Sequence, residues 1–128
     1  MRIFKNRPFT RFAIKSGISD MALCKAITDA EQGLIDADLG GGVIKQRVAR
    51  KGQGKSGGFR TMILFKEGTR AFFVHGFAKN EQANINDDEL VALKKLAVEM
   101  LNYADAELTE AVNKNKLTEI TCNGQTIP

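Results

Sequence analysis

The sequence gathers its densest group of cationic side chains around a glycine-rich stretch. Residues 45–60 contain six lysines or arginines and no aspartate or glutamate. Guanidinium and ammonium groups bind phosphate oxygens, and glycine lets the backbone approach a ligand closely. This combination favours contact with the phosphates of a polyanion, although a solvated basic loop has the same composition. The cations are Lys45, Arg47, Arg50, Lys51, Lys55 and Arg60, and the glycines among them are Gly52, Gly54, Gly57 and Gly58.

The tripeptide Gly54-Lys55-Ser56 matches the end of a nucleotide-binding P-loop, but its surroundings do not. A P-loop has a glycine five residues before the glycine that precedes its lysine, and that position is Ala49 here. A P-loop also leads from a strand into a helix whose N-terminus faces the phosphates. The run that follows here, FRTMILF, is typical of a strand. We therefore interpret the stretch as a loop between two strands that lays lysines against a phosphate backbone.

Charge is distributed unevenly along the whole chain. Residues 1–80 carry 15 lysines and arginines against 6 acids, whereas residues 81–128 carry 4 against 9. A second window without acids, residues 2–15, holds five cations. This segregation indicates either one surface that binds a polyanion or a solvated basic face, and charge alone leaves both open.

The runs Phe59–Lys66 and Thr69–Phe77 predict a β-hairpin, and its register decides which side chains meet. With a two-residue turn, Arg60 lies opposite His75 on one face of the sheet. With a three-residue turn and a bulge, Arg60 lies opposite Val74 and His75 turns away. The sequence leaves both registers open.

In the first register, Arg60 and His75 would lie beside the loop that carries Lys55. Lys79 follows the second strand and would complete a cationic cluster. Histidine is the residue type that exchanges a proton most readily near neutral pH. A strand histidine satisfied by a neighbouring group is an equal alternative for His75.

The remaining elements follow from hydrophobic spacing and from capping residues. Ser19 predicts the start of one helix, and Asn86 with Glu89 three residues later predicts the start of another. The expected order is β-α-α-β-β-β-α-β, an α+β fold with a small antiparallel-centred sheet and helices packed on one face. Expected besides the hairpin are strands over 2–5, 43–49 and 116–122, and helices from Pro8, after Ser19, and from Asn86 to near Asn102, with further helical turns to about Asn113.

Length and composition describe an ordinary globular chain. Its 128 residues, 43% hydrophobic, predict a single domain over 1–128. The apolar runs are too short for a membrane span, and no apolar stretch follows the basic N-terminus as in a signal peptide. Cys24 and Cys122 lack CxxC or metal spacing, so we expect reduced, buried thiols in a cytoplasmic protein. No cluster of ligand residues suggests a metal or another cofactor.

Residues 39–66, LGGGVIKQRVARKGQGKSGGFRTMILFK, followed by FFVHGFAKNEQANINDDEL, resemble the RelE-type toxins of bacterial toxin–antitoxin pairs. The similarity is greatest to the branch close to HigB. The pattern joins K-x-R, a glycine and lysine loop, G-F-R, an apolar hairpin and G-F-x-K, so it is more specific than any single motif. These motifs cover about half of the chain, and most of the remainder agrees in the order of its elements.

The resemblance implies a small α+β ribonuclease fold that cleaves messenger RNA, commonly in the decoding site of the ribosome. It also implies a cognate antitoxin, often a helix-turn-helix protein, in a toxin–antitoxin hetero-oligomer. By position, Arg60 matches an arginine that contacts the scissile phosphate region, and Lys79 matches a basic residue after the hairpin. Lys51 and Lys55 match the basic loop that contacts the RNA backbone, and Arg47 and Arg50 match cations on the preceding strand. We expect Lys45, Arg47, Arg50 and Lys51 to bind RNA.

RNA cleavage without a metal needs a proton acceptor, a proton donor and charge to stabilise the phosphorane. We expect Arg60 to stabilise the phosphorane and Lys55, Lys79 or His75 to transfer protons. Relatives often carry a C-terminal tyrosine or histidine as a base or stacking residue, but the only tyrosine here is Tyr103 and no histidine follows His75. Two alternatives to a ribonuclease therefore remain: a ParE-like inhibitor of DNA gyrase and a degenerate nucleic-acid-binding module.

Overall fold

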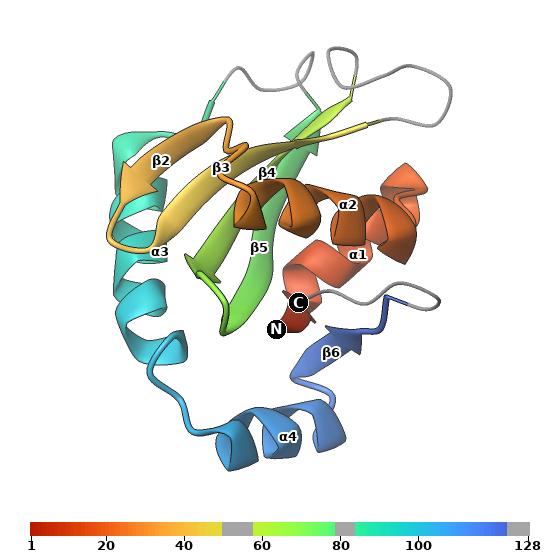
Figure 1. The fold of residues 1–128 in the computed structure, drawn as a ribbon, viewed down its shortest axis with the longest axis vertical. Helices are drawn as coiled ribbons and strands as arrows, with labels where there is room; N and C mark the ends of the chain where they lie inside the picture. Colours follow the sequence, from red (N-terminus) through yellow and green to blue (C-terminus); the bar gives the residue numbers. More distant parts are fainter. Residues whose placement is uncertain (50–57, 79–83, 123–128) are drawn as a thin grey trace.

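The computed structural model describes residues 1–49, 58–78 and 84–122. Six strands form one sheet in the order β2-β3-β4-β5-β1-β6 (Figure 1). Neighbouring strands are antiparallel except β1 and β5, which run parallel. The strands are β1 (Arg2–Asn6), β2 (Ala37–Gly40), β3 (Val43–Val48), β4 (Phe59–Lys66), β5 (Arg70–Ala78) and β6 (Leu117–Ile120). The helices are α1 (Arg7–Ser16), α2 (Asp20–Glu31), α3 (Asp87–Met100) and α4 (Asp105–Asn113).

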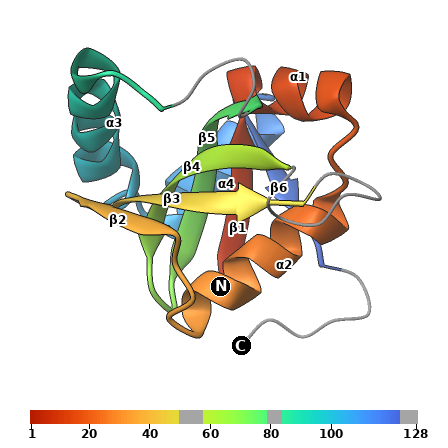
Figure 2. The same cartoon turned by 90° about the horizontal axis from the view of Figure 1, so that it is seen from above.

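The α+β class is confirmed, but the helices cover both faces of the sheet and not the single face we expected. α1 and α2 pack with Ile63 of β4 in one apolar cluster. α3 and α4 pack in a second cluster with Met62 and Leu64, the neighbours of Ile63 in the strand. Figure 2 shows α2 and α3 on opposite sides of β3 and β4. Successive strand residues point to opposite faces, and both sets are apolar in the run FRTMILF, so both faces need cover.

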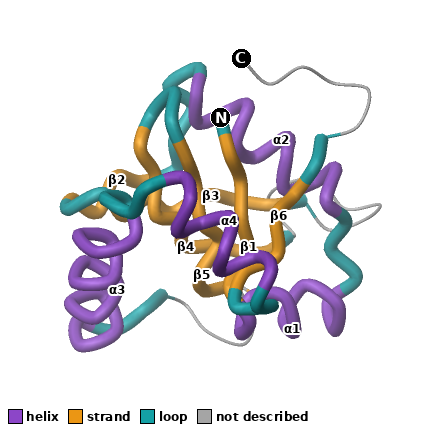
Figure 3. Tube along the Cα trace, turned by 90° about the horizontal axis from the view of Figure 1, so that it is seen from below, coloured by secondary structure: helices purple, strands orange, loops and turns teal. Residues whose placement is uncertain are grey.

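The predicted helix starts are confirmed by their capping hydrogen bonds. The side chain of Ser19 accepts a hydrogen bond from the backbone N–H of Ala22 at the start of α2. At the start of α3, Asn86 Oδ1 accepts from the Glu89 backbone N–H, and Glu89 Oε1 accepts from the Asn86 backbone N–H. The expected helical turns to Asn113 form a separate helix, α4, after the break at residues 101–104 (Figure 3). The capping hydrogen bonds at the starts of α2 and α3 satisfy backbone donors that otherwise lack a partner in the first turn of a helix.

Strand β2 was not predicted. It pairs with β3 across a turn at Gly41 and Gly42, where φ is +63° and +85°. Glycine reaches these values without a Cβ clash, so the turn is possible where another residue would be strained. The strand sequence, ADLG, shows neither alternation nor β-branched side chains. Gly40, Gly41 and Gly42 therefore connect two paired strands.

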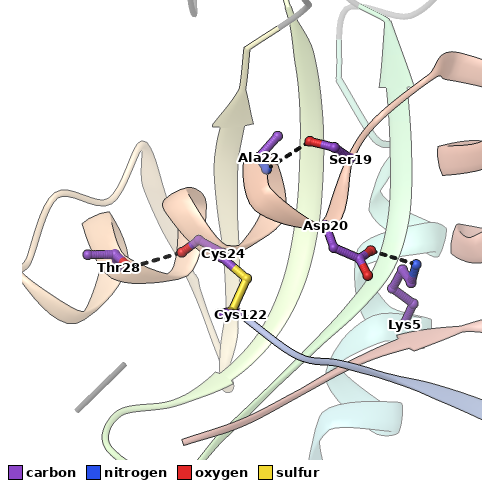
Figure 4. The surroundings of a disulfide bond; sticks show 7 residues. All are labelled: Lys5, Ser19, Asp20, Ala22, Cys24, Thr28 and Cys122. Atoms are coloured by element: carbon purple, nitrogen blue, oxygen red, sulfur yellow. Dashed lines mark hydrogen bonds and ion pairs between the residues drawn. A yellow bond between two sulfur atoms is a disulfide. The ribbon is translucent and has the colours of Figure 1, made fainter. Parts of the chain in front are cut away.

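The expectation of reduced thiols is wrong, because Cys24 and Cys122 form a disulfide (Figure 4). Cys24 lies in α2, Cys122 lies two residues after β6, and their Cα atoms are 6.0 Å apart. This separation is ordinary for a disulfide. The two cysteines are 98 residues apart in sequence, so only the position of β6 beside β1 brings them together. No helix in the described part of the chain is long and apolar enough to cross a membrane.

Candidate phosphate-binding site

The pairing of β3, β4 and β5 gathers four of the predicted residues on one face of the sheet. Arg47 pairs with Arg60, and Arg60 pairs in turn with Phe77. In the next row on the same face, Lys45 pairs with Met62, which pairs with His75. Side chains opposite each other on neighbouring strands lie on the same face and close together. This face is the one covered by α3, because Met62 and Phe77 belong to the same apolar cluster as that helix.

Arg60 is the most unusual member of this group because its side chain is buried. Its relative exposure is 7%, and Nη1 is buried without a hydrogen-bond partner. A guanidinium is always charged and carries five N–H donors, so a buried donor without an acceptor is unfavourable. An anion at this position would supply the missing acceptor and the opposite charge. Arg60 therefore has the properties of a phosphate ligand.

The hairpin register differs from both alternatives left open by the sequence. The turn has three residues, as in the second alternative, but β5 contains a bulge at Val74, opposite the step from Met62 to Ile63. The extra residue places His75 opposite Met62, so His75 stays on the face of Arg60 and is displaced by one row. Arg60 and His75 are thus diagonal neighbours and not a direct cross-strand pair.

His75 lies between an aromatic ring and a carboxylate. Its ring centroid is 5.9 Å from that of Phe77. Its Nε2 is buried, has no hydrogen-bond partner, and lies 3.9 Å from Glu89 Oε2 on α3. The other oxygen of Glu89 is held by the backbone N–H of Asn86. Sequence reasoning missed Glu89 as a site residue, because its position in the helix cap already explains a glutamate there.

The two cations on β3 have different environments. The Nε of Arg47 lies 3.1 Å from Asp36 Oδ1, and its side chain is 45% exposed. Like charges directly opposite on neighbouring strands repel, and Asp36 offsets the repulsion between Arg47 and Arg60. Lys45 is half-buried and has no ion pair with a described residue. Both cations lie on the β3 side of Arg60, where they could contact phosphates next to one bound at Arg60.

Four predicted site residues, Arg50, Lys51, Lys55 and Lys79, lie outside the described residues. Their roles stay predictions. The strand ends from which these segments continue are described: Val48, Phe59 and Ala78 form one row across β3, β4 and β5. That row adjoins the row of Arg47, Arg60 and Phe77.

The fold and this cationic face define a class of small α+β proteins with a site suited to a phosphate chain. The sequence model of the RelE toxin of the RelE/RelB toxin–antitoxin system matches residues 1–120. The chain belongs to the RelE toxin family, as its motifs predicted. Comparison with curated proteins gives no match. Membership of a toxin–antitoxin family implies a cognate antitoxin as partner.

Proposed function

We propose that the protein is an endoribonuclease toxin that cleaves messenger RNA on the ribosome without a metal ion. A cognate antitoxin, which we expect to be a helix-turn-helix protein, holds it inactive in a hetero-oligomer. The observation that carries this proposal is the buried Arg60 guanidinium with an unpaired donor, on the same sheet face as His75. Membership of the RelE family supports it. Because ribosomes and messenger RNA lie in the cytoplasm, we expect the protein to act there.

In the proposed reaction the 2′-oxygen attacks phosphorus as its proton leaves, and the bond from phosphorus to the 5′-oxygen breaks. The 5′-oxygen takes up a proton, and the products are a 2′,3′-cyclic phosphate and a 5′-hydroxyl. Arg60 stabilises the negative charge of the phosphorane, which is where a fixed donor has its largest effect. His75 exchanges a proton with the reacting oxygens, and Lys55 and Lys79 are candidates for the second proton transfer.

Binding of the rest of the RNA strand uses the cations around this centre. In the proposal, Lys45 and Arg47 contact phosphates on the described face of β3. Arg50 and Lys51, which follow in sequence, extend that contact as predicted from the sequence. Such contacts hold the strand in register but do not read its bases.

The Arg60→Met variant tests this proposal. We expect cleavage to fall by roughly 10²- to 10³-fold, the usual effect of losing one donor to a charged transition state. The melting temperature should stay equal or rise, because an apolar side chain replaces a buried group that has a donor without a hydrogen-bond partner. Lys66→Met is the matched control, since Lys66 is exposed at the far end of the same strand. Primer extension on messages and thermal melting of the purified proteins provide the two readouts.

The outcome separates the proposal from its alternatives. Induced wild-type protein should arrest growth and produce new, in-frame cleavage sites that disappear in Arg60→Met. Arrest with intact messages and inhibited DNA supercoiling would instead identify a gyrase inhibitor. Folded wild-type protein that causes no arrest would leave a nucleic-acid-binding module without toxin activity.

A further inference from the structure

Helix α1 carries a line of cations that the proposed cleavage site does not use. Arg7, Arg11 and Lys15 are all exposed and recur every four residues, so they lie along one side of the helix at intervals of about 6 Å. We call these three residues the α1 stripe. The helix contains no acidic residue, and no ion pair joins the stripe to another described residue.

Several other cations in the described ranges contrast with the α1 stripe, because each lies within ion-pair distance of a carboxylate. Arg2 pairs with Glu119, Lys5 with Asp20, Lys25 with Asp29, Arg70 with Asp105 and Lys114 with Glu110. A paired cation is largely neutralised for a distant ligand, whereas unpaired cations on one surface add their fields. The stripe is therefore a concentrated positive surface on this side of the molecule.

The packing of α1 sets the stripe beside the end of the sheet that holds the candidate site. Strand β1 runs parallel to β5 with Lys5 opposite Phe73, so α1 begins next to the level of Val74 and His75. Asn6, which caps α1, donates from Nδ2 to the Val74 carbonyl at 3.3 Å.

The two surfaces lie on opposite faces of the sheet but at the same strand ends. The ring of Phe12 on α1 meets the ring of Phe59 edge-on, with centroids 5.6 Å apart. Phe59 directly precedes Arg60 in β4, and neighbouring strand residues point to opposite faces. A long polyanion that crosses the end of β4 and β5 can therefore contact Arg60 on one side and α1 on the other.

We propose that the α1 stripe binds the phosphate backbone of RNA outside the cleaved segment, and so holds the protein on a large, structured RNA. This inference deepens the proposed function, because an enzyme that cuts messages on the ribosome needs contacts with RNA other than its substrate. None of the aromatic residues in the described ranges is fully exposed for stacking on bases, so the contacts of the stripe are with phosphates and independent of sequence.

The test measures equilibrium binding to a structured RNA as a function of salt, in an Arg60→Met background that does not cut the probe. The variant Arg7→Gln/Arg11→Gln/Lys15→Gln removes the stripe and keeps residues that favour helix. We expect the slope of log K against log salt to fall by about 2, and affinity near 0.1 M salt to fall on the order of 10- to 100-fold. The control, Lys66→Gln/Lys95→Gln/Lys116→Gln, loses the same charge from scattered exposed positions and should change the slope by less than half as much.

Single-turnover cleavage of messenger RNA on saturating ribosomes by the stripe variant with Arg60 intact should match wild type, because the cleavage site itself is unchanged. Equal slopes for the stripe variant and the control would overturn the inference. Unchanged RNA binding with weakened binding of the antitoxin would overturn it as well and assign the stripe to an acidic protein surface. Failure of wild type to cut messenger RNA on ribosomes would contradict the proposed function, while a stripe-dependent salt slope would still support this inference.

Discussion

At the level of single residues, the two carboxylate oxygens of Glu89 face different groups. Glu89 Oε1 accepts from the Asn86 backbone N–H at 3.0 Å, and Oε2 lies 3.9 Å from His75 Nε2. The first contact stabilises the start of α3. The second places a negatively charged carboxylate next to the imidazole of His75. We infer that Glu89 is a positioning residue for His75.

The Glu89→Gln variant separates these two roles. Glutamine at this position still closes the capping box, so the melting temperature should change little. If the carboxylate charge supports proton transfer by His75, kcat should fall by roughly tenfold with KM unchanged. The same substitution in a His75→Gln background should add no further loss, as expected for two groups that act together. An unchanged kcat for Glu89→Gln would show that Glu89 acts only in the cap of α3 and does not assist His75.

Tyr103 provides a spectroscopic test of the break between α3 and α4. Its hydroxyl donates to Glu99 Oε1 at 2.6 Å, and this hydrogen bond, followed by partial burial and the charges of Glu99 and Glu107, raises the pKa of Tyr103 above its ordinary value of 10.0. Because the folded state holds the proton more tightly, the contribution to stability is present below pH 10 and is lost as pH rises through the raised pKa.

The prediction for Tyr103 is that tyrosinate absorbance in the native protein has a midpoint above pH 10. Tyr103 is the only tyrosine and the chain has no tryptophan, so the signal has one source. Glu99→Gln should move the midpoint down towards that of unfolded protein, since it removes the largest cause of the shift. Equal midpoints for wild type and Glu99→Gln would show that the hydrogen bond is absent in solution.

At the level of elements, α1 approaches β5 through a position that has no side chain. A Cβ at Gly76 would lie 2.7 Å from Phe12 Cδ2 and 3.1 Å from Phe9 Cε1. A glycine fits under these two rings because it has no Cβ. The φ of Gly76 is not in the left-handed region. Steric contact, not backbone strain, therefore governs this position.

We expect Gly76→Ala to lower the free energy of unfolding by about 1–3 kcal/mol, the usual range for overpacking a core. A second change, Phe12→Leu, removes the ring that the new methyl group meets and should recover part of the loss. Denaturant unfolding of the two single variants and of the double variant measures both effects. A Gly76→Ala protein as stable as wild type would show that α1 shifts freely on β5.

Elements that depend on nearby residues were predictable, and those that depend on distant packing were not. The caps at Ser19 and Asn86 and the apolar hairpin follow from local spacing. The bulge at Val74 does not follow from local spacing, because it depends on which side chains fill the two clusters on opposite faces. The position of Arg60 near the start of a strand was predictable, but its burial and the approach of Glu89 depend on how α3 docks.

At the level of the whole molecule, the disulfide is the longest-range link in the fold. It joins α2 to the chain just after β6, across 98 residues, and closes one edge of the cluster that contains α1, α2 and β1. Figure 4 shows it beside the Lys5–Asp20 ion pair, which joins β1 to α2 at 3.0 Å. These two links fix α2 to the β1–β6 side of the sheet.

Reduction should therefore destabilise the protein without changing its fold. Closing a loop of this length stabilises a protein by about 2–5 kcal/mol, because the cross-link restricts the unfolded chain. Denaturant unfolding with and without a thiol reductant should show a loss in this range. The variant Cys24→Ser/Cys122→Ser should match the reduced wild type and be insensitive to reductant.

Thiol titration of the oxidised, denatured protein should find no free thiol. Alkylation in lysed cells before and after reduction then decides whether the bond forms in the cell. Thiols that react without reduction would mean that the protein acts in cells in its less stable form.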